Sequence, residues 1–157
     1  MQGRRDEIII ITGWAAVLVL SAIGPKDYAT WFMEVLPVMI AVPLLWFSRK
    51  GFPLSRILLW CAFAHGLILI MGGHYTYAHV PVGFWLQDVF DFARNPYDRI
   101  GHLAQGFVPA LLTREILMRK TPLRPGKMLF TLVVCVPLAF SAFYEMIEWW
   151  AAVVMDQ

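Results

Sequence analysis

Charged residues are scarce in this chain of 157 residues. Asp, Glu, Lys and Arg make up 15% of it and apolar residues 59%, whereas a soluble domain carries about 25% charged and about 45–50% apolar residues. The mean hydropathy is +0.62. So few charges cannot cover a globule in water, which excludes a disordered chain, a fibrous protein and an ordinary soluble enzyme. We therefore expect lipid to surround much of the surface.

The low net charge, the small number of cysteines and the missing catalytic motifs exclude further classes of function. The net charge of +2 is too small to indicate nucleic acid as a partner. The two cysteines, Cys61 and Cys135, lie inside apolar stretches, so we expect no disulfide. The sequence also lacks the motifs of a serine hydrolase elbow, a P-loop, a dinucleotide-binding turn and a His-Glu-x-x-His metalloprotease. Because none of these motifs is present, the sequence does not identify a reaction by motif.

Five apolar stretches are long enough to cross a bilayer as helices. The fourth is the weakest because its ends hold polar and charged residues. The first follows two arginines, as in a signal peptide, but no Ala-x-Ala-like cleavage site follows it, so we favour an uncleaved anchor. We predict an all-α, polytopic membrane helix bundle that forms a single integral domain over residues 1–157. The predicted spans are 8–24, 31–47, 56–73, 100–118 and 128–150.

Lys and Arg are distributed unevenly between the two predicted sides. Ten lie in the N-terminus and in the second and fourth loops, against three in the first and third loops. Because basic residues favour the cytoplasmic side, this bias predicts a cytoplasmic N-terminus and places the C-terminal end of the chain outside. The ten are Arg4, Arg5, Arg49, Lys50, Arg56, Arg114, Arg119, Lys120, Arg124 and Lys127.

Acidic and histidine side chains gather near the other, outer ends of the predicted spans. Ionisable groups at membrane depth are costly and usually face the bundle interior. Asp98 and His102 are four residues apart, and Glu145 and Glu148 are three apart, so each pair shares a helix face. We place Glu34 in the first turn of the second span. The predicted outer cluster comprises Glu34, His74, Asp98, His102, Glu145 and Glu148.

Several chemistries suit such a cluster. Two close carboxylates in a low dielectric need a shared proton, an arginine partner such as Arg94 or Arg99, or a metal. Histidine with carboxylate ligands suits Zn, Mn or Fe. Two simpler interpretations stay open: Asp98 caps the fourth span, and Glu145 and Glu148 face water. The predicted ligands of a divalent metal are His74, Asp98, His102, Glu145 and Glu148.

The third loop, residues 76–97, is long for a connection without structure of its own. Residues 83–92 place apolar residues between acids and predict a short interfacial helix. We expect Val80-Pro81 to precede this helix and Asn95-Pro96 to end it. The helix either covers the outer cluster or only anchors the loop at the membrane surface.

Four polar motifs stand out along the chain: Gly72-Gly73-His74-Tyr75-Thr76-Tyr77, Arg94-Asn95-Pro96-Tyr97-Asp98-Arg99-Ile100-Gly101-His102, Gln105-Gly106-Phe107 and Tyr144-Glu145-Met146-Ile147-Glu148-Trp149-Trp150. These motifs resemble those of the YjdF family of bacterial inner-membrane proteins and, more faintly, the pattern of VanZ-like membrane proteins. The resemblance covers nearly the whole chain and implies an integral protein of the bacterial inner membrane. Family members usually continue with an acidic outer loop and one more helix, so we expect this chain to lack a C-terminal helix that its relatives have.

Two functions follow from these observations. In the first, an enzyme acts on a lipid or envelope substrate at the outer leaflet. His102 and Glu148 are then the catalytic acid/base groups, and Tyr75, Arg99 and Glu34 bind the substrate. In the second, the protein is not an enzyme: it binds an ion or a lipid, or serves as a subunit, and the cluster holds the helices in register. We expect membrane lipids as partners, and association with a second copy or another membrane subunit stays open.

Overall fold

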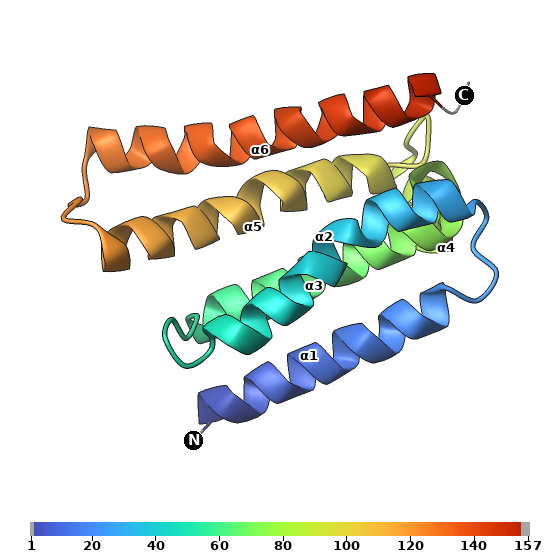
Figure 1. Cartoon of the computed structure of the whole chain (residues 1–157). Helices are drawn as coiled ribbons and strands as arrows, with labels where there is room; N and C mark the ends of the chain where they lie inside the picture. Colours follow the sequence, from blue (N-terminus) through green and yellow to red (C-terminus); the bar gives the residue numbers. More distant parts are fainter. Residues whose placement is uncertain (1, 155–157) are drawn as a thin grey trace. The chain divides into compact units, whose positions relative to one another are not determined.

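The protein is all-helical, as predicted, in this computed structural model, which describes residues 2–154 and the side chains of residues 5–154. Within that range it contains no strand. Figure 1 shows the helices along the chain. They are α1 (Gln2–Ser21), α2 (Tyr28–Ser48), α3 (Arg56–Tyr75), a 3₁₀ turn (Tyr77–His79), α4 (Pro81–Phe90), α5 (Tyr97–Lys120) and α6 (Lys127–Val154).

The helices overlap all five predicted spans. Three of those described, α2, α3 and α6, are long and apolar enough to cross a membrane, judged by length and composition. Among the described helices, α1 does not meet this criterion because several charged residues lie in its first two turns. Helix α5 does not meet it because polar and charged residues lower its mean hydropathy. The membrane-spanning class is thus supported, and the number of five spans stays a prediction.

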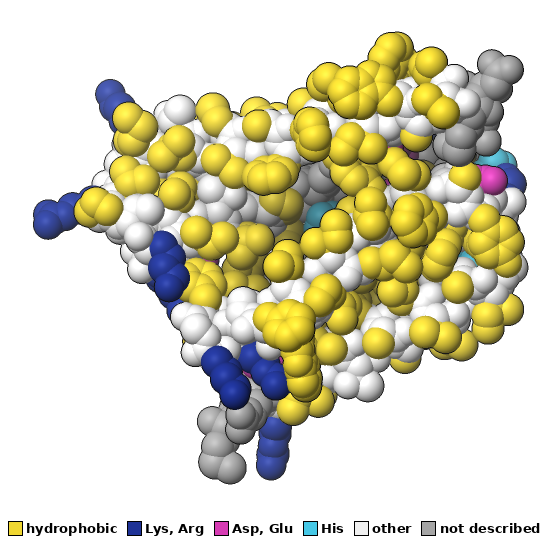
Figure 2. Space-filling model, viewed as in Figure 1, with side chains coloured by type: hydrophobic (Ala, Val, Ile, Leu, Met, Phe, Trp, Pro, Cys, Tyr) yellow, Lys and Arg dark blue, Asp and Glu magenta, His cyan; other side chains and the backbone are white. Residues whose placement is uncertain are grey.

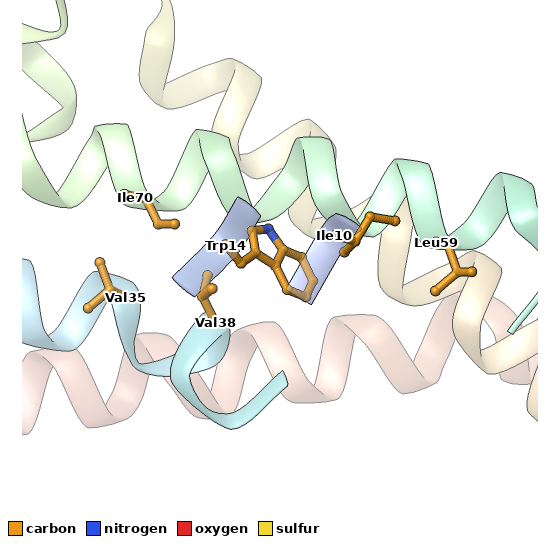
Figure 3. Close-up of a cluster of buried hydrophobic side chains, with 6 residues drawn as sticks. All are labelled: Ile10, Trp14, Val35, Val38, Leu59 and Ile70. Carbon is orange, nitrogen blue, oxygen red and sulfur yellow. The ribbon is translucent and has the colours of Figure 1, made fainter. Parts of the chain in front are cut away.

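The chain divides into two compact units, Met1–His102 (unit 1) and Leu103–Gln157 (unit 2). In unit 1, α1, α2 and α3 pack against one another in pairs. The indole of Trp14 donates to the carbonyl of Phe63 at 3.2 Å and lies where a Cβ on Gly66 would stand. Glycine is therefore required there for the close approach of α1 to α3. Figure 3 shows the core side chains Ile10, Trp14, Val35, Val38, Leu59 and Ile70.

Polar contacts at the two ends of unit 1 fix the directions of its helices. Asp6 in α1 lies 2.8 Å from Arg56 at the start of α3. At the opposite end, the side chain of His74 near the end of α3 meets the carbonyl of Ser21, the last residue of α1. Therefore α1 and α3 run in the same direction and α2 returns between them. This order places the loop between α2 and α3 at the same end as the start of α1, as the distribution of basic residues predicts.

Local capping moves two helix boundaries from their predicted positions. Helix α2 begins at Tyr28, because the carboxylate of Asp27 accepts the N–H of Thr30 at 2.6 Å. Glu34 therefore lies in the second turn of this helix, not in the first as predicted. Helix α1 ends at Ser21, and Gly24 follows with a left-handed φ of 66° that a helix cannot continue.

The third loop contains the predicted helix, α4, with Pro81 in its first turn. We expected Asn95-Pro96 to end it, and this was wrong: it ends at Phe90. Asp91 takes a left-handed conformation with φ 53°, and its N–H and that of Phe92 both turn back to the carbonyl of Gln87. The helix is confirmed, and its position at the membrane surface stays a prediction.

Unit 2 consists mostly of α6 and the part of α5 from residue 103 onward, joined by residues 121–126. The side chain of Gln105 donates to the hydroxyl of Ser141 at 3.2 Å. A polar contact between two apolar helices fixes how they line up, because few other groups in lipid can satisfy either partner. Pro109 and Pro137 lie inside these helices and each removes a backbone donor.

Candidate functional site

His74 joins three chain segments at the end of unit 1 where α1 and α3 finish. Its Nδ1 lies 2.8 Å from the carbonyl oxygen of Ser21, and its own carbonyl accepts the N–H of Lys26 at 2.9 Å. The hydroxyl of Ser21 accepts from the indole of Trp31 at 3.0 Å and donates to the carbonyl of Leu18 at 2.8 Å. Because a carbonyl only accepts, His74 carries a proton on Nδ1. This histidine therefore holds α1, the start of α2 and α3 together.

Tyr75 and Glu34 lie beside this junction. The ring of Tyr75 meets that of His74 edge to face, with centroids 4.6 Å apart. A Cβ on Gly73 would stand 3.0 Å from the Cβ of Glu34, so α2 and α3 pass closely at this level. Of the predicted residues, the structure thus brings Glu34, His74 and Tyr75 to one end of the three-helix core.

Asp98 and His102 form a second polar group at the start of α5. The Nε2 of His102 lies 3.5 Å from Oδ1 of Asp98, and the two side chains are 54% and 50% exposed. We considered Asp98 as the N-cap of this helix, and this was wrong: the helix begins at Tyr97, so Asp98 lies inside its first turn. A carboxylate there still favours the helix because it faces the positive end of the helix dipole. Arg99 follows and is exposed.

Tyr77 packs between α3 and α5, on another side of α3 from the junction at His74. Its ring lies 2.5 Å from where a Cβ on Gly72 would stand and 2.7 Å from where one on Gly101 would. Two residues turn a helix by about 200°, so His74 points away from the face of α3 that Gly72 presents to Tyr77. The ring of Tyr97 lies 5.9 Å from that of Tyr77 and completes this contact.

No group of three or more His, Cys, Asp or Glu side chains that could hold a metal ion is found in the described part of the chain. The orientation of His74 accounts for part of this, since its ring faces α1. The structure therefore does not support the predicted five-residue ligand set, and metal binding stays a prediction.

Asn95 organises the third loop, a role that the sequence did not reveal. Its amide nitrogen donates to the carbonyl oxygens of Ala78, at 3.3 Å, and Val80, at 3.1 Å. Its amide oxygen accepts the N–H of Tyr97 at 3.0 Å. Gly83 packs so closely that a Cβ there would overlap this amide. Asn95 thus joins the 3₁₀ turn and α4 to the start of α5; the sequence signal was the Asn-Pro pair, which we interpreted only as a helix stop.

Glu145 and Glu148 lie in unit 2, on α6. They come after Ser141, on the side away from the 121–126 connection, and their spacing places them on one helix face. Glu145 is exposed and Glu148 is half-buried. Because the other predicted residues belong to unit 1, the joint site of histidines and glutamates stays a prediction.

His65 lies in the middle of α3, about nine residues or 13 Å along the helix from His74. Its Nε2 is buried and has no hydrogen-bond partner among the described residues. A buried nitrogen without a partner costs stability. His65 therefore lies too far along α3 to join the group of Glu34, His74 and Tyr75 at the end of this helix.

The described fold, with its exposed apolar side chains and three helices long enough to cross a bilayer, defines a helical membrane protein. The chain belongs to the family described as "Predicted membrane protein (DUF2238)", which matches residues 7–157. It is 51% identical over 141 residues to "Inner membrane protein YjdF" of Escherichia coli (strain K12), which covers 90% of this chain and 68% of that relative. No solved structure matches. The resemblance to the YjdF family is confirmed, and the VanZ-like resemblance stays a prediction.

Proposed function

We propose that this protein resides in the bacterial inner membrane and acts on a lipid or another envelope molecule at the outer ends of its helices. Its location is supported by the relative of 51% identity that is named an inner membrane protein. The orientation, with the N-terminus in the cytoplasm and the C-terminal end of the chain outside, is supported by the bias in Lys and Arg.

The observation that carries the proposal is the Asp98–His102 pair. Asp98 lies next to the imidazole of His102, as a carboxylate does when it orients a histidine for proton transfer. Both side chains are about half exposed, so a substrate can reach them. His102 is therefore our candidate general acid/base group. At the level of the lipid head groups both a phosphate ester and water are available to it.

The remaining predicted residues have supporting roles in this proposal. Arg99, exposed beside Asp98, supplies positive charge for an anionic head group. Tyr75 and Glu34 lie at the outer end of unit 1 and bind polar parts of the substrate. Glu148 is the second acid/base group. A divalent metal on His74, Asp98, His102, Glu145 and Glu148 is not required by this scheme.

The test uses the full chain purified in detergent and reconstituted with polar lipids from a bacterial inner membrane. Lipid products are followed by mass spectrometry, thermal unfolding is measured in parallel, and bound metal is counted per chain. We expect turnover by the unmodified protein, loss of turnover with His102→Asn, and unchanged unfolding temperature. The matched control is His79→Asn, because His79 is an exposed histidine in the third loop, away from Asp98, whose ring nitrogen Nδ1 lies 3.0 Å from the hydroxyl of Thr76.

Turnover that persists in His102→Asn would contradict the assignment of His102. Absence of any lipid change with the unmodified protein would contradict the enzymatic proposal. A metal content near zero per chain would contradict the predicted metal site and would not contradict the acid/base role of His102.

A second candidate function, a non-enzymatic membrane protein with a structural polar cluster, is favoured by the bonds of His74. This side chain joins two helices through Ser21, as expected for a residue that holds helices in register. Under this proposal His74→Ala and His102→Asn both lower the unfolding temperature, and no lipid is altered. Under the enzymatic proposal only His74→Ala lowers the unfolding temperature, because the lost hydrogen bond reduces the free energy of unfolding by about 1 kcal/mol.

A further inference from the structure

The connection between α5 and α6, in unit 2, concentrates positive charge. Residues 114–127 contain five basic residues and one acid, Glu115, and that acid bonds to Arg119 at 2.6 Å. Arg114, Arg124 and Lys127 are exposed. Figure 2 shows Lys and Arg side chains projecting at this end of α5 and α6. The positive charge therefore greatly exceeds the local negative charge.

The connection is folded, which gives these cations a defined frame. The hydroxyl of Thr121 donates to the carbonyl of Leu117 at 2.6 Å and accepts the N–H of Leu123 at 3.2 Å. The N–H of Phe130 bonds to the carbonyl of Gly126 at 3.0 Å. A surface that is ordered before binding loses less conformational entropy when a partner arrives.

Exposed apolar side chains lie within about a turn of the same charges. Met118 is 37% exposed, Met128 63% and Phe130 70%. A matching partner therefore offers an anion and hydrocarbon side by side. A phospholipid offers both in one molecule, a phosphate beside its acyl chains, whereas a nucleic acid backbone offers the phosphate without acyl chains.

We propose that this basic connection, defined as Arg114, Arg124 and Lys127 on the segment 114–127, binds the phosphate of an anionic phospholipid. The acyl chains of the lipid lie along Met128 and Phe130. The site shares no residue with those of the proposed function and does not depend on them. Each Lys or Arg near an anionic membrane surface strengthens attraction by about fivefold, so removing two is expected to weaken binding by about 25-fold.

The test uses the full chain in a non-ionic detergent, titrated with phosphatidylglycerol. Native mass spectrometry measures the dissociation constant of the first lipid molecule that binds. The variant is Arg124→Gln/Lys127→Gln, whose exposed positions leave folding unchanged. The matched control is Lys26→Gln/Arg94→Gln, which removes two exposed cations outside the connection. Phosphatidylcholine, which has no net charge, tests whether binding requires an anionic head group. Inorganic phosphate, which has no acyl chains, tests whether binding requires hydrocarbon.

We expect phosphatidylglycerol to bind more tightly than phosphatidylcholine, and its binding to weaken by about 25-fold in the variant and by less than about twofold in the control. Added salt weakens binding to the unmodified protein more than to the variant. Three results would each overturn the proposal: equal binding by variant and unmodified protein, equal affinity for the two lipids, or full displacement by inorganic phosphate at the lipid's own concentration.

Discussion

The contact between Gly83 and Asn95 makes a sharp prediction about the third loop. Asn95→Ala removes the hydrogen bonds to Val80 and Tyr97, at 3.1 and 3.0 Å, and a longer, exposed one to Ala78. A net hydrogen bond contributes about 1 kcal/mol, and the exposed one adds little. We therefore expect Asn95→Ala to reduce the free energy of unfolding of this segment by about 2 kcal/mol.

Gly83→Ala is expected to act through the same contact. The φ of Gly83 is not in the left-handed region, so alanine fits the local backbone, and helix propensity alone favours it by about 1 kcal/mol. Its Cβ would nevertheless overlap the amide of Asn95 and displace it, so the single change is destabilising. In the double variant the amide is absent and the Cβ has room. The double variant is therefore no less stable than Asn95→Ala.

The assay combines equilibrium unfolding of the full chain in detergent with amide hydrogen exchange over residues 76–97. We expect faster exchange in that segment for each single variant and a coupling of about 1–2 kcal/mol between the two changes. Asp88→Ala, an exposed change on the same helix, serves as the control and leaves exchange unchanged. If the two destabilisations simply add, Gly83 and Asn95 do not share this contact and the reasoning fails.

The remaining predictions concern one helix contact and one cap. Gln105→Ala and Ser141→Ala are each expected to lower stability in detergent by about 0.6 kcal/mol, and the double variant by no more than either; additive losses would show that the bond does not form. The hydrogen bonds from Thr30 hold the pKa of Asp27 below its ordinary value, so its cap stabilises the fold at neutral pH and weakens as the pH falls below about 4. Asp27→Asn is expected to remove that part of the acid sensitivity in a thermal melt, and an unchanged acid loss would contradict it.

Features that depend on one stretch of chain could be predicted from the sequence. Long apolar stretches favour helices because lipid cannot satisfy exposed backbone groups, so the helical class and the approximate positions of the long helices followed from composition. The spacing of Asp98 and His102 predicted their meeting, because residues four apart share a helix face. Val80-Pro81 marked the start of α4 to within two residues, although Pro81 is the first residue of the helix and does not precede it as predicted, because proline suits the first turn of a helix.

Features that depend on contacts between distant residues required the tertiary structure. His74 and Asp98 share a predicted depth, but depth does not give the rotation of a helix about its axis, and the packing of α1 against α3 turned His74 toward Ser21. Asn95 looked like a helix stop, and only the folded loop brought the carbonyl oxygens of Ala78 and Val80 to its amide. The sequence by itself therefore determined that this protein is a helical membrane protein, and it predicted polar groups near the outer ends of its helices. Packing decided which of those groups meet, because that depends on how neighbouring helices rotate and approach one another.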